Sequence, residues 1–315
     1  MVQETGSPSV STEDDAELRR SLKQLSRPSD SAGLRHLAAH VGLLCVTSAA
    51  IILAPFWWLA LPAMLVQGVV LVFLFAPLHE AIHYTAFASR GLSKGVAAVI
   101  GLLLLLPSRW FRCYHLAHHR HTQDPNRDPE LQTRPINSRY RHWRHLSGLP
   151  YWRAQARLIV RQARGRVDDP FVPAGERRSV ILQARLYLIA YAAIAVVSVL
   201  TGSWLALTLW VIPALLGQPF LRAYLMAEHG DCPFVSDFFR NTRTTFTNRF
   251  VRFLAWNMPY HSEHHAFPAV PFHRLPAAHR LLSERLAVVG SGYLAVQRDL
   301  YARYPSSWRE EARSS

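Results

Sequence analysis

The feature that most constrains this chain is a long stretch without charge: residues 41–78 include no Lys, Arg, Asp, Glu or His. A second apolar stretch, residues 181–227, is interrupted only by Arg185 and Arg222. At 1.5 Å per helical residue, each stretch is about long enough to cross a hydrocarbon layer roughly 30 Å thick twice. We therefore predict an all-α integral membrane protein with four transmembrane helices in two hairpins, at about 41–78 and 181–227. Buried core helices of a soluble protein are the alternative, but such cores seldom contain runs this long.

The positive charge of the chain is distributed unevenly around these hairpins. The formal net charge is +14, and fifteen arginines lie between residues 107 and 178, whereas neither hairpin tip has a Lys or Arg. Loops rich in Lys and Arg stay on the cytoplasmic side of a membrane. We expect both termini and the central loop in the cytoplasm, in a bacterial inner membrane. Since no nucleic-acid-binding module accompanies the charge, we expect no nucleic-acid partner.

The remaining segments complete a predicted domain organisation. Residues 1–35 are polar and are expected to form a flexible cytoplasmic tail. Residues 36–285 are predicted to form the membrane domain, with a helical cap built from the cytoplasmic loops. Residues 286–315 are predicted to form a C-terminal cytoplasmic helix and tail. The apolar segment 95–107 is too short to span a membrane and is predicted to be re-entrant or interfacial.

Three histidine clusters carry the chemistry of this sequence. They read HEAIH (79–83), HLAHH (115–119) and HSEHH (261–265), with histidines three or four residues apart, on one face of a helix. Their eight imidazoles exceed what one tetrahedral zinc can use. The number indicates two metal ions side by side, beside apolar segments suited to a lipid-like substrate.

The predicted topology brings these clusters to one membrane surface. The first cluster follows the second crossing directly, and the third lies beyond the fourth crossing. If residues 95–107 crossed the membrane, the second cluster would lie on the opposite side. A re-entrant segment therefore allows all three clusters to meet at the cytoplasmic face.

At these clusters the chain resembles the membrane-bound fatty acid desaturase and hydroxylase superfamily, which is identified by three histidine boxes. The resemblance extends from about residue 41 to residue 279, and longer strings such as HLAHHRHTQDPNRDPE are similar to bacterial members with a fatty-acid-desaturase-type domain. It implies a non-haem site with two Fe ions (Fe2+/Fe3+) that uses O2 to remove hydrogen from unactivated C–H bonds of an acyl chain. Carried over residue by residue, the implied metal ligands are His79, His83, His115, His118, His119, His261, His264 and His265.

Two further residues are suggested by the same resemblance. Some members use an additional histidine before the third box, and His229 lies in the corresponding region. Some also have an asparagine near the metal, for which Asn257 is a loose candidate. We expect no catalytic residue beyond the metal ligands.

Acidic residues near the boxes are candidates for orienting the ligands, because metal-bound histidines commonly donate their second ring N–H to a carboxylate. An arginine partner or a solvated loop position is an equally good interpretation of each one. The candidates are Asp124, Asp128, Glu130, Glu228, Asp231 and Glu263. Of the other histidines, His36, His40, His142 and His145 are expected to be surface or interfacial residues, and His121, His273 and His279 are expected to support the ligands or the structure.

Three alternatives to a desaturase remain open at this level. A hydroxylase or oxygenase of an alkyl, carotenoid or specialised-metabolite substrate would use the same site. A membrane zinc metalloprotease would use the HExxH of the first box, with Glu80 as general base, but leaves the other boxes unexplained. A metal transporter would place its ligands near the middle of the bilayer, whereas these boxes lie at helix ends.

The expected partners follow from the chemistry. The chain has no His-Pro-Gly-Gly haem motif and no CxxC pair. We therefore expect a separate electron donor: a ferredoxin, a cytochrome or a reductase. A basic cytoplasmic surface favours docking of an acidic carrier. The other partners are the membrane and a lipid or acyl-chain substrate.

Overall fold

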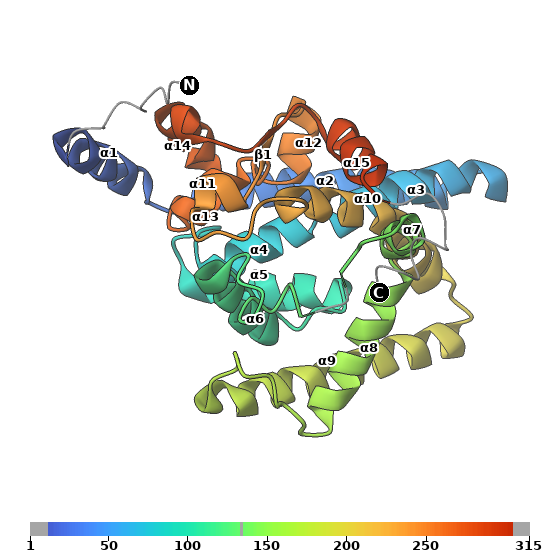
Figure 1. Ribbon diagram of the computed structural model, residues 1–315. Helices are drawn as coiled ribbons and strands as arrows, with labels where there is room; N and C mark the ends of the chain where they lie inside the picture. Colours follow the sequence, from blue (N-terminus) through green and yellow to red (C-terminus); the bar gives the residue numbers. More distant parts are fainter. Residues whose placement is uncertain (1–11, 133–134, 305–315) are drawn as a thin grey trace.

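The computed structural model describes residues 12–132 and 135–304, and these are mainly helical (Figure 1). The helices are α1 (Thr12–Leu25), α2 (Asp30–Ile52), α3 (Trp57–Val72), α4 (Phe75–His83), α5 (Arg90–Leu103), α6 (Ser108–His121), α7 (Arg139–Leu146), α8 (Leu149–Ala163), α9 (Ala174–Thr201), α10 (Ile212–His229), α11 (Phe238–Asn241), α12 (Arg249–Leu254), α13 (His261–Ala266), α14 (Leu275–Leu282) and α15 (Tyr293–Ala302). Short elements complete the fold: η1 (Leu207–Val211), η2 (Phe272–Arg274), η3 (Ser283–Arg285), β1 (Thr244–Thr245) and β2 (Val289–Gly290).

Four helical segments of the described chain are long and apolar enough to cross a membrane, as the sequence predicts. They are Asp30–Ile52, Trp57–His83, Ala174–Thr201 and Leu207–His229. The bent pair α5 and α6 would add a fifth span if it were counted as one. Helix α2 packs against α3, but α9 packs mainly against α8 and α6. The arrangement in two hairpins therefore stays a prediction.

Helices α3 and α10 approach each other closely because each has a glycine at the crossing. A Cβ atom on Gly68 would lie 2.1 Å from the carbonyl oxygen of Pro213, and one on Gly217 would lie 2.1 Å from the carbonyl oxygen of Gly68. Small residues allow membrane helices to pack backbone against backbone. This contact fixes the position of α10, and therefore of His229 at its end, relative to α3 and the following α4.

The turn between α5 and α6 bends the chain by 101° and is held by aromatic side chains from other elements. Tyrosine hydroxyls and an indole N–H donate to backbone carbonyls at the end of α5: Tyr187 to Ala98 (2.5 Å), Tyr191 to Leu102 (2.7 Å), Trp210 to Leu103 (2.8 Å) and Tyr151 to Leu104 (3.2 Å). Irregular backbone at membrane depth needs such internal partners. The contacts suit a re-entrant segment, which remains an interpretation because one broken span has the same length and composition.

The structure differs from the prediction at the N-terminal end. The segment predicted as a flexible tail, residues 1–35, includes α1 and the start of α2, and only residues 1–11 lie outside the described part. The physical reason is that Leu22 of α1 packs into the main hydrophobic core. At the other end, β2 pairs in parallel with β1 and leads into α15, while residues 305–315 of the predicted C-terminal tail are not described.

Candidate metal centre

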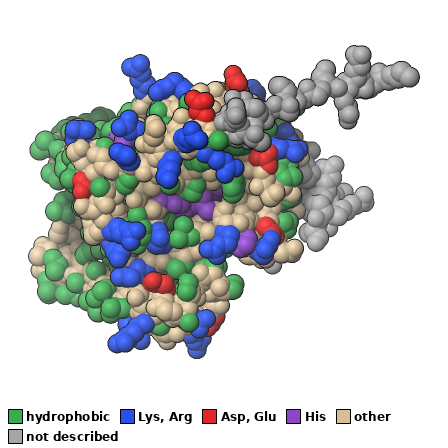
Figure 2. Space-filling view, turned by 90° about the vertical axis from the view of Figure 1, so that its left-hand side faces the viewer, with side chains coloured by type: hydrophobic (Ala, Val, Ile, Leu, Met, Phe, Trp, Pro, Cys, Tyr) green, Lys and Arg blue, Asp and Glu red, His purple; other side chains and the backbone are tan. Residues whose placement is uncertain are grey.

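The nine predicted ligands come from four helices that meet at one place. The first two lie at the end of α4, three lie along α6, one is the last residue of α10, and three lie on the short α13. The histidines on α4 and on α6 keep the helical spacing that the sequence predicts. Figure 2 shows histidine side chains at the centre of one face, with Lys and Arg side chains around them.

The histidines fall into two groups, each compact enough to hold a metal ion. The first group comprises His79, His83, His115, His119 and His264. Each of these residues contributes one ring nitrogen, and these five nitrogens all lie within 4.8 Å of one another. The second group satisfies the same limit and comprises His118, His229 and His265. His261 stands beside the second group, with its ring centroid 4.6 Å from that of His265 and 5.1 Å from that of His229. We call these sets the five-histidine group and the four-histidine group, the latter including His261.

Hydrogen bonds define which nitrogens of the four-histidine group face inward. Nδ1 of His118 lies 3.0 Å from Oδ1 of Asp128, and Nδ1 of His229 lies 3.3 Å from the carbonyl oxygen of Asn241. Both partners are acceptors, so each Nδ1 carries the proton. The two Nε2 atoms then hold lone pairs in the neutral rings, yet they lie 3.2 Å apart. A metal ion between these two nitrogens would accept both lone pairs.

The five-histidine group has a similar convergence around His119. Its Nε2 lies 3.0 Å from Nε2 of His115 and 3.2 Å from Nε2 of His264. Metal–imidazole bonds of about 2.0–2.1 Å at angles of 90–110° place neighbouring ligand nitrogens about 3.0–3.4 Å apart. Both ring nitrogens of His79 are also buried without a hydrogen-bond partner among the described residues. These residues therefore fit a bound metal ion.

The third box is held in the neutral form that metal binding requires. Burial, followed by the charges of neighbouring imidazoles, lowers the pKa of His261, His264 and His265 well below the usual value. A neutral imidazole offers a lone pair to a metal, whereas an imidazolium has none. The box is therefore ready to coordinate at neutral pH.

Three polar residues that the sequence analysis missed also contact the site. The Thr122 hydroxyl donates to the His118 carbonyl at 2.8 Å, and its oxygen lies 3.2 Å from Nδ1 of His265. The side-chain amide of Gln123 donates to the His229 carbonyl at 2.8 Å. Asn241 contributes its backbone carbonyl. Thr122 and Gln123 lie three and four residues after the last histidine of the second box, and this proximity was the available signal. Nothing in the sequence marks Asn241.

Three of the acidic candidates lie beside predicted ligands, two pair with arginines and one pairs with a histidine outside the boxes. Asp128 contacts His118, and Oε1 of Glu228 lies 3.4 Å from Nδ1 of His261. Oε2 of Glu130 lies 3.8 Å from Nδ1 of His118. In contrast, Asp124 and Asp231 pair with arginines, and Glu263 contacts Nδ1 of His279 at 2.5 Å: the pairs are Asp124–Arg127, Asp231–Arg303 and Glu263–His279.

Several residues outside the boxes are more deeply packed than the sequence suggests. The expectation that His40 and His142 are surface or interfacial residues is wrong, whereas His36 is partly buried. The His36 ring stacks on Phe253, His40 is fully buried with Nε2 2.8 Å from the Val70 carbonyl oxygen, and His142 is buried. The Asn257 amide donates to the Phe272 carbonyl at 3.1 Å, so no contact with the histidine groups supports its candidacy.

Glu80, the general base of a metalloprotease interpretation, points away from the histidines. One carboxylate oxygen accepts the backbone N–H of Phe272 at 2.9 Å, and the side chain is fully buried. A general base must reach a metal-bound water. Its position gives no support to proteolysis.

Comparisons with known proteins agree with this geometry. A family model described as "Fatty acid desaturase" matches residues 55–296, which include all nine histidines. The chain is also similar to a sphingolipid delta(4)-desaturase from Drosophila melanogaster, with 27% identity over 237 residues, covering 72% of this chain and 67% of that protein.

Proposed function

Because the chain belongs to the fatty acid desaturase family, a family of oxidoreductases of lipid metabolism, we propose that it desaturates an acyl chain with a di-iron site and O2. The observation that carries the proposal is the pair of histidine groups, each with imidazole nitrogens converging on one point. Imidazole suits iron as well as zinc. Iron bound there would supply the redox chemistry that C–H cleavage needs and that zinc lacks.

The protein residues have distinct tasks in this proposal. The nine histidines hold the metals. Asp128, Thr122 and the Asn241 carbonyl fix the inward nitrogens of three of them through hydrogen bonds on the opposite side of each ring. Neutral imidazole ligands would leave the positive charge of bound metal ions uncompensated.

The substrate class follows from the membrane context and the relatives. The relative acts on a sphingolipid, as its name states, and two of the candidate spans end at His83 and His229. We propose a long-chain lipid or fatty acyl substrate. We place the site, the termini and the arginine-rich loop in the cytoplasm of a bacterial cell, from the distribution of positive charge.

The electron donor is proposed to dock on the arginine-rich segment of α7 and α8. A positive patch accelerates association with an acidic carrier. Neutralising Arg141, Arg144 and Arg153 together should slow donor-coupled turnover while leaving reduction by a small chemical reductant unchanged. Unchanged coupled turnover would contradict the docking site.

The decisive test is expression in a host that lacks the gene, followed by mass spectrometry of lipids. Loss of two hydrogens from an acyl chain supports desaturation, whereas gain of one oxygen atom would indicate the hydroxylase alternative. A measured iron content of about two ions per chain would distinguish both the desaturase and the hydroxylase from a zinc protease. Metal uptake into vesicles would indicate a transporter, and we expect none.

A further inference from the structure

Helix α8 lies at the boundary between membrane and water. Its last residue, Ala163, accepts a hydrogen bond of 2.9 Å from Arg185 of α9, and Tyr151 near its start lies under the guanidinium of Arg222, 4.4 Å from the ring centroid. These two arginines bound the uncharged part of the second apolar stretch. Charged groups on spanning helices extend to the interface. The C-terminal end of α8, beside Arg185, is thus at the depth of lipid headgroups.

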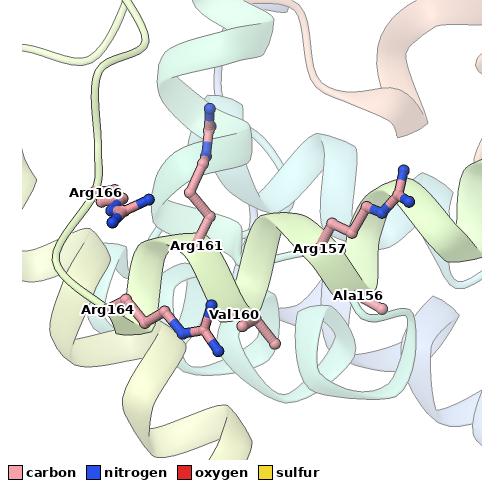
Figure 3. A pocket seen from close by; sticks show the side chains of 6 residues that line it. All are labelled: Ala156, Arg157, Val160, Arg161, Arg164 and Arg166. Atoms are coloured by element: carbon pink, nitrogen blue, oxygen red, sulfur yellow. The ribbon is translucent and has the colours of Figure 1, made fainter.

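A basic cleft opens along this helix, with a volume of about 350 Å³. Figure 3 shows that its side chains come from the C-terminal half of α8 and the loop that follows: Ala156, Arg157, Val160, Arg161, Arg164 and Arg166. Four of the six are arginines. Arg164 extends beside Val160, so charged and apolar groups line the same cleft (Figure 3).

Only one of these arginines is neutralised by a neighbour in the described part of the chain. Arg161 donates to both carboxylate oxygens of Asp169 at 2.8 Å, and the Trp110 indole donates to the same carboxylate at 3.2 Å. Asp169 is therefore already engaged. Arg157, Arg164 and Arg166 are exposed and form no ion pair with any described residue. Three exposed positive charges at one cleft favour the binding of an anion.

An apolar stripe lies next to this charge. Leu182, Leu186 and Ile189 of α9 are more than half exposed, at one or two helical turns from each other. Leu182 and Ile189 share the face of α9 that carries Arg185, which binds the end of α8. A ligand that combines an anionic head with hydrocarbon chains matches both surfaces.

We propose that the α8 cleft binds the phosphate of an anionic phospholipid, whose acyl chains lie along the exposed stripe of α9. Arginine guanidinium groups suit phosphate oxygens because their paired N–H groups can donate to two oxygens at once. The site is separate from the histidine groups. It would anchor α8 and the start of α9 to the bilayer surface independently of catalysis.

The test compares lipids retained by purified protein in mild detergent. The protein is incubated with equal amounts of phosphatidylglycerol and phosphatidylcholine with the same acyl chains, and bound lipid is quantified by native mass spectrometry. The cleft variant is R157Q/R164Q/R166Q, and the control R19Q/R20Q/R280Q removes the same charge from exposed positions elsewhere. A third arm adds excess inorganic phosphate.

We expect wild type and control to retain phosphatidylglycerol preferentially, and the cleft variant to lose this preference by about tenfold. Equal retention by the two triple variants would overturn the proposal. Displacement of the lipid by inorganic phosphate would also overturn it, since the cleft would then serve a soluble phosphate. If the triple variant does not fold by circular dichroism, R164Q alone should still lower the preference, and an unchanged preference in R164Q would reject the site.

Discussion

The two histidine groups have the same chemistry but different support. In the four-histidine group three rings have hydrogen-bond partners outside the boxes, namely Asp128 for His118, the Asn241 carbonyl for His229 and Thr122 for His265, and Oε1 of Glu228 lies 3.4 Å from Nδ1 of His261. In the five-histidine group, buried nitrogens of His79, His83, His119 and His264 have no hydrogen-bond partner in the described chain. Hydrogen bonds to residues outside the boxes orient three rings of the four-histidine group, whereas these buried nitrogens of the five-histidine group have no such bond in the described chain.

This difference suggests that the two metals have different sensitivities. Partners that hold a ligand ring strengthen metal binding, commonly by 10–100-fold. The four-histidine group should bind its metal more tightly and depend on residues outside the boxes. The five-histidine group should depend on the ligands and on the packing of α4 against α6.

The largest effect is expected from removing one ligand in each group. His118→Ala and His264→Ala should each lower product formation at least about hundredfold, because each leaves an ion with an incomplete ligand set. Bound iron, measured by elemental analysis, should fall from about two ions to about one per chain in either variant. Activity that survives both substitutions would rule out the di-iron assignment.

Gly217→Val should affect metal binding by the two histidine groups differently, because it disturbs the packing of α10 on α3. The new side chain meets the Gly68 backbone, and overpacking of this kind costs about 3 kcal/mol. Since α10 carries His229, the four-histidine group should lose metal before the five-histidine group does. Thermal unfolding in detergent and metal content measure this. The matched variant Gly42→Val, at a glycine with open space around it, should behave as wild type.

Asp128→Asn tests the support of the four-histidine group directly. The amide has nearly the same shape but no charge, so His118 loses its carboxylate partner, and metal affinity or turnover should fall 10–100-fold. Asp124→Asn is the control, because Asp124 pairs with Arg127 rather than a histidine. Equal effects of the two substitutions would show that the Asp128 contact does not orient His118.

Thr122→Val should have the smallest effect. It removes the oxygen beside Nδ1 of His265, and one such hydrogen bond contributes about 1 kcal/mol, or roughly fivefold in metal affinity. Competition with a chelator measures the change. Thr201→Val removes a hydroxyl that bonds only within its own helix and should leave the affinity unchanged. If metal affinity does not change in the Thr122 variant, then only Asp128 and the Asn241 carbonyl support the ligands of this group.

The sequence predicts the membrane class and the gathering of the histidines because both depend on local patterns. Uncharged stretches give the four candidate spans, and spacing of three or four places box histidines on one helical face. Roles that depend on tertiary packing are beyond such patterns. Asp124 and Asp128 both follow the second box, yet only the folded loop turns Asp128 toward His118. The burial of His40 depends in the same way on the approach of Val70.

The glycine crossing of α3 and α10 has a consequence for biogenesis. The residues that build the site stretch from position 79 to position 265, on both sides of this contact. Neither group is complete until the third box has left the ribosome and α10 has docked on α3. Iron loading should therefore be a late step of maturation, and nascent chains that stop before residue 261 should insert into the membrane without acquiring the metal pair.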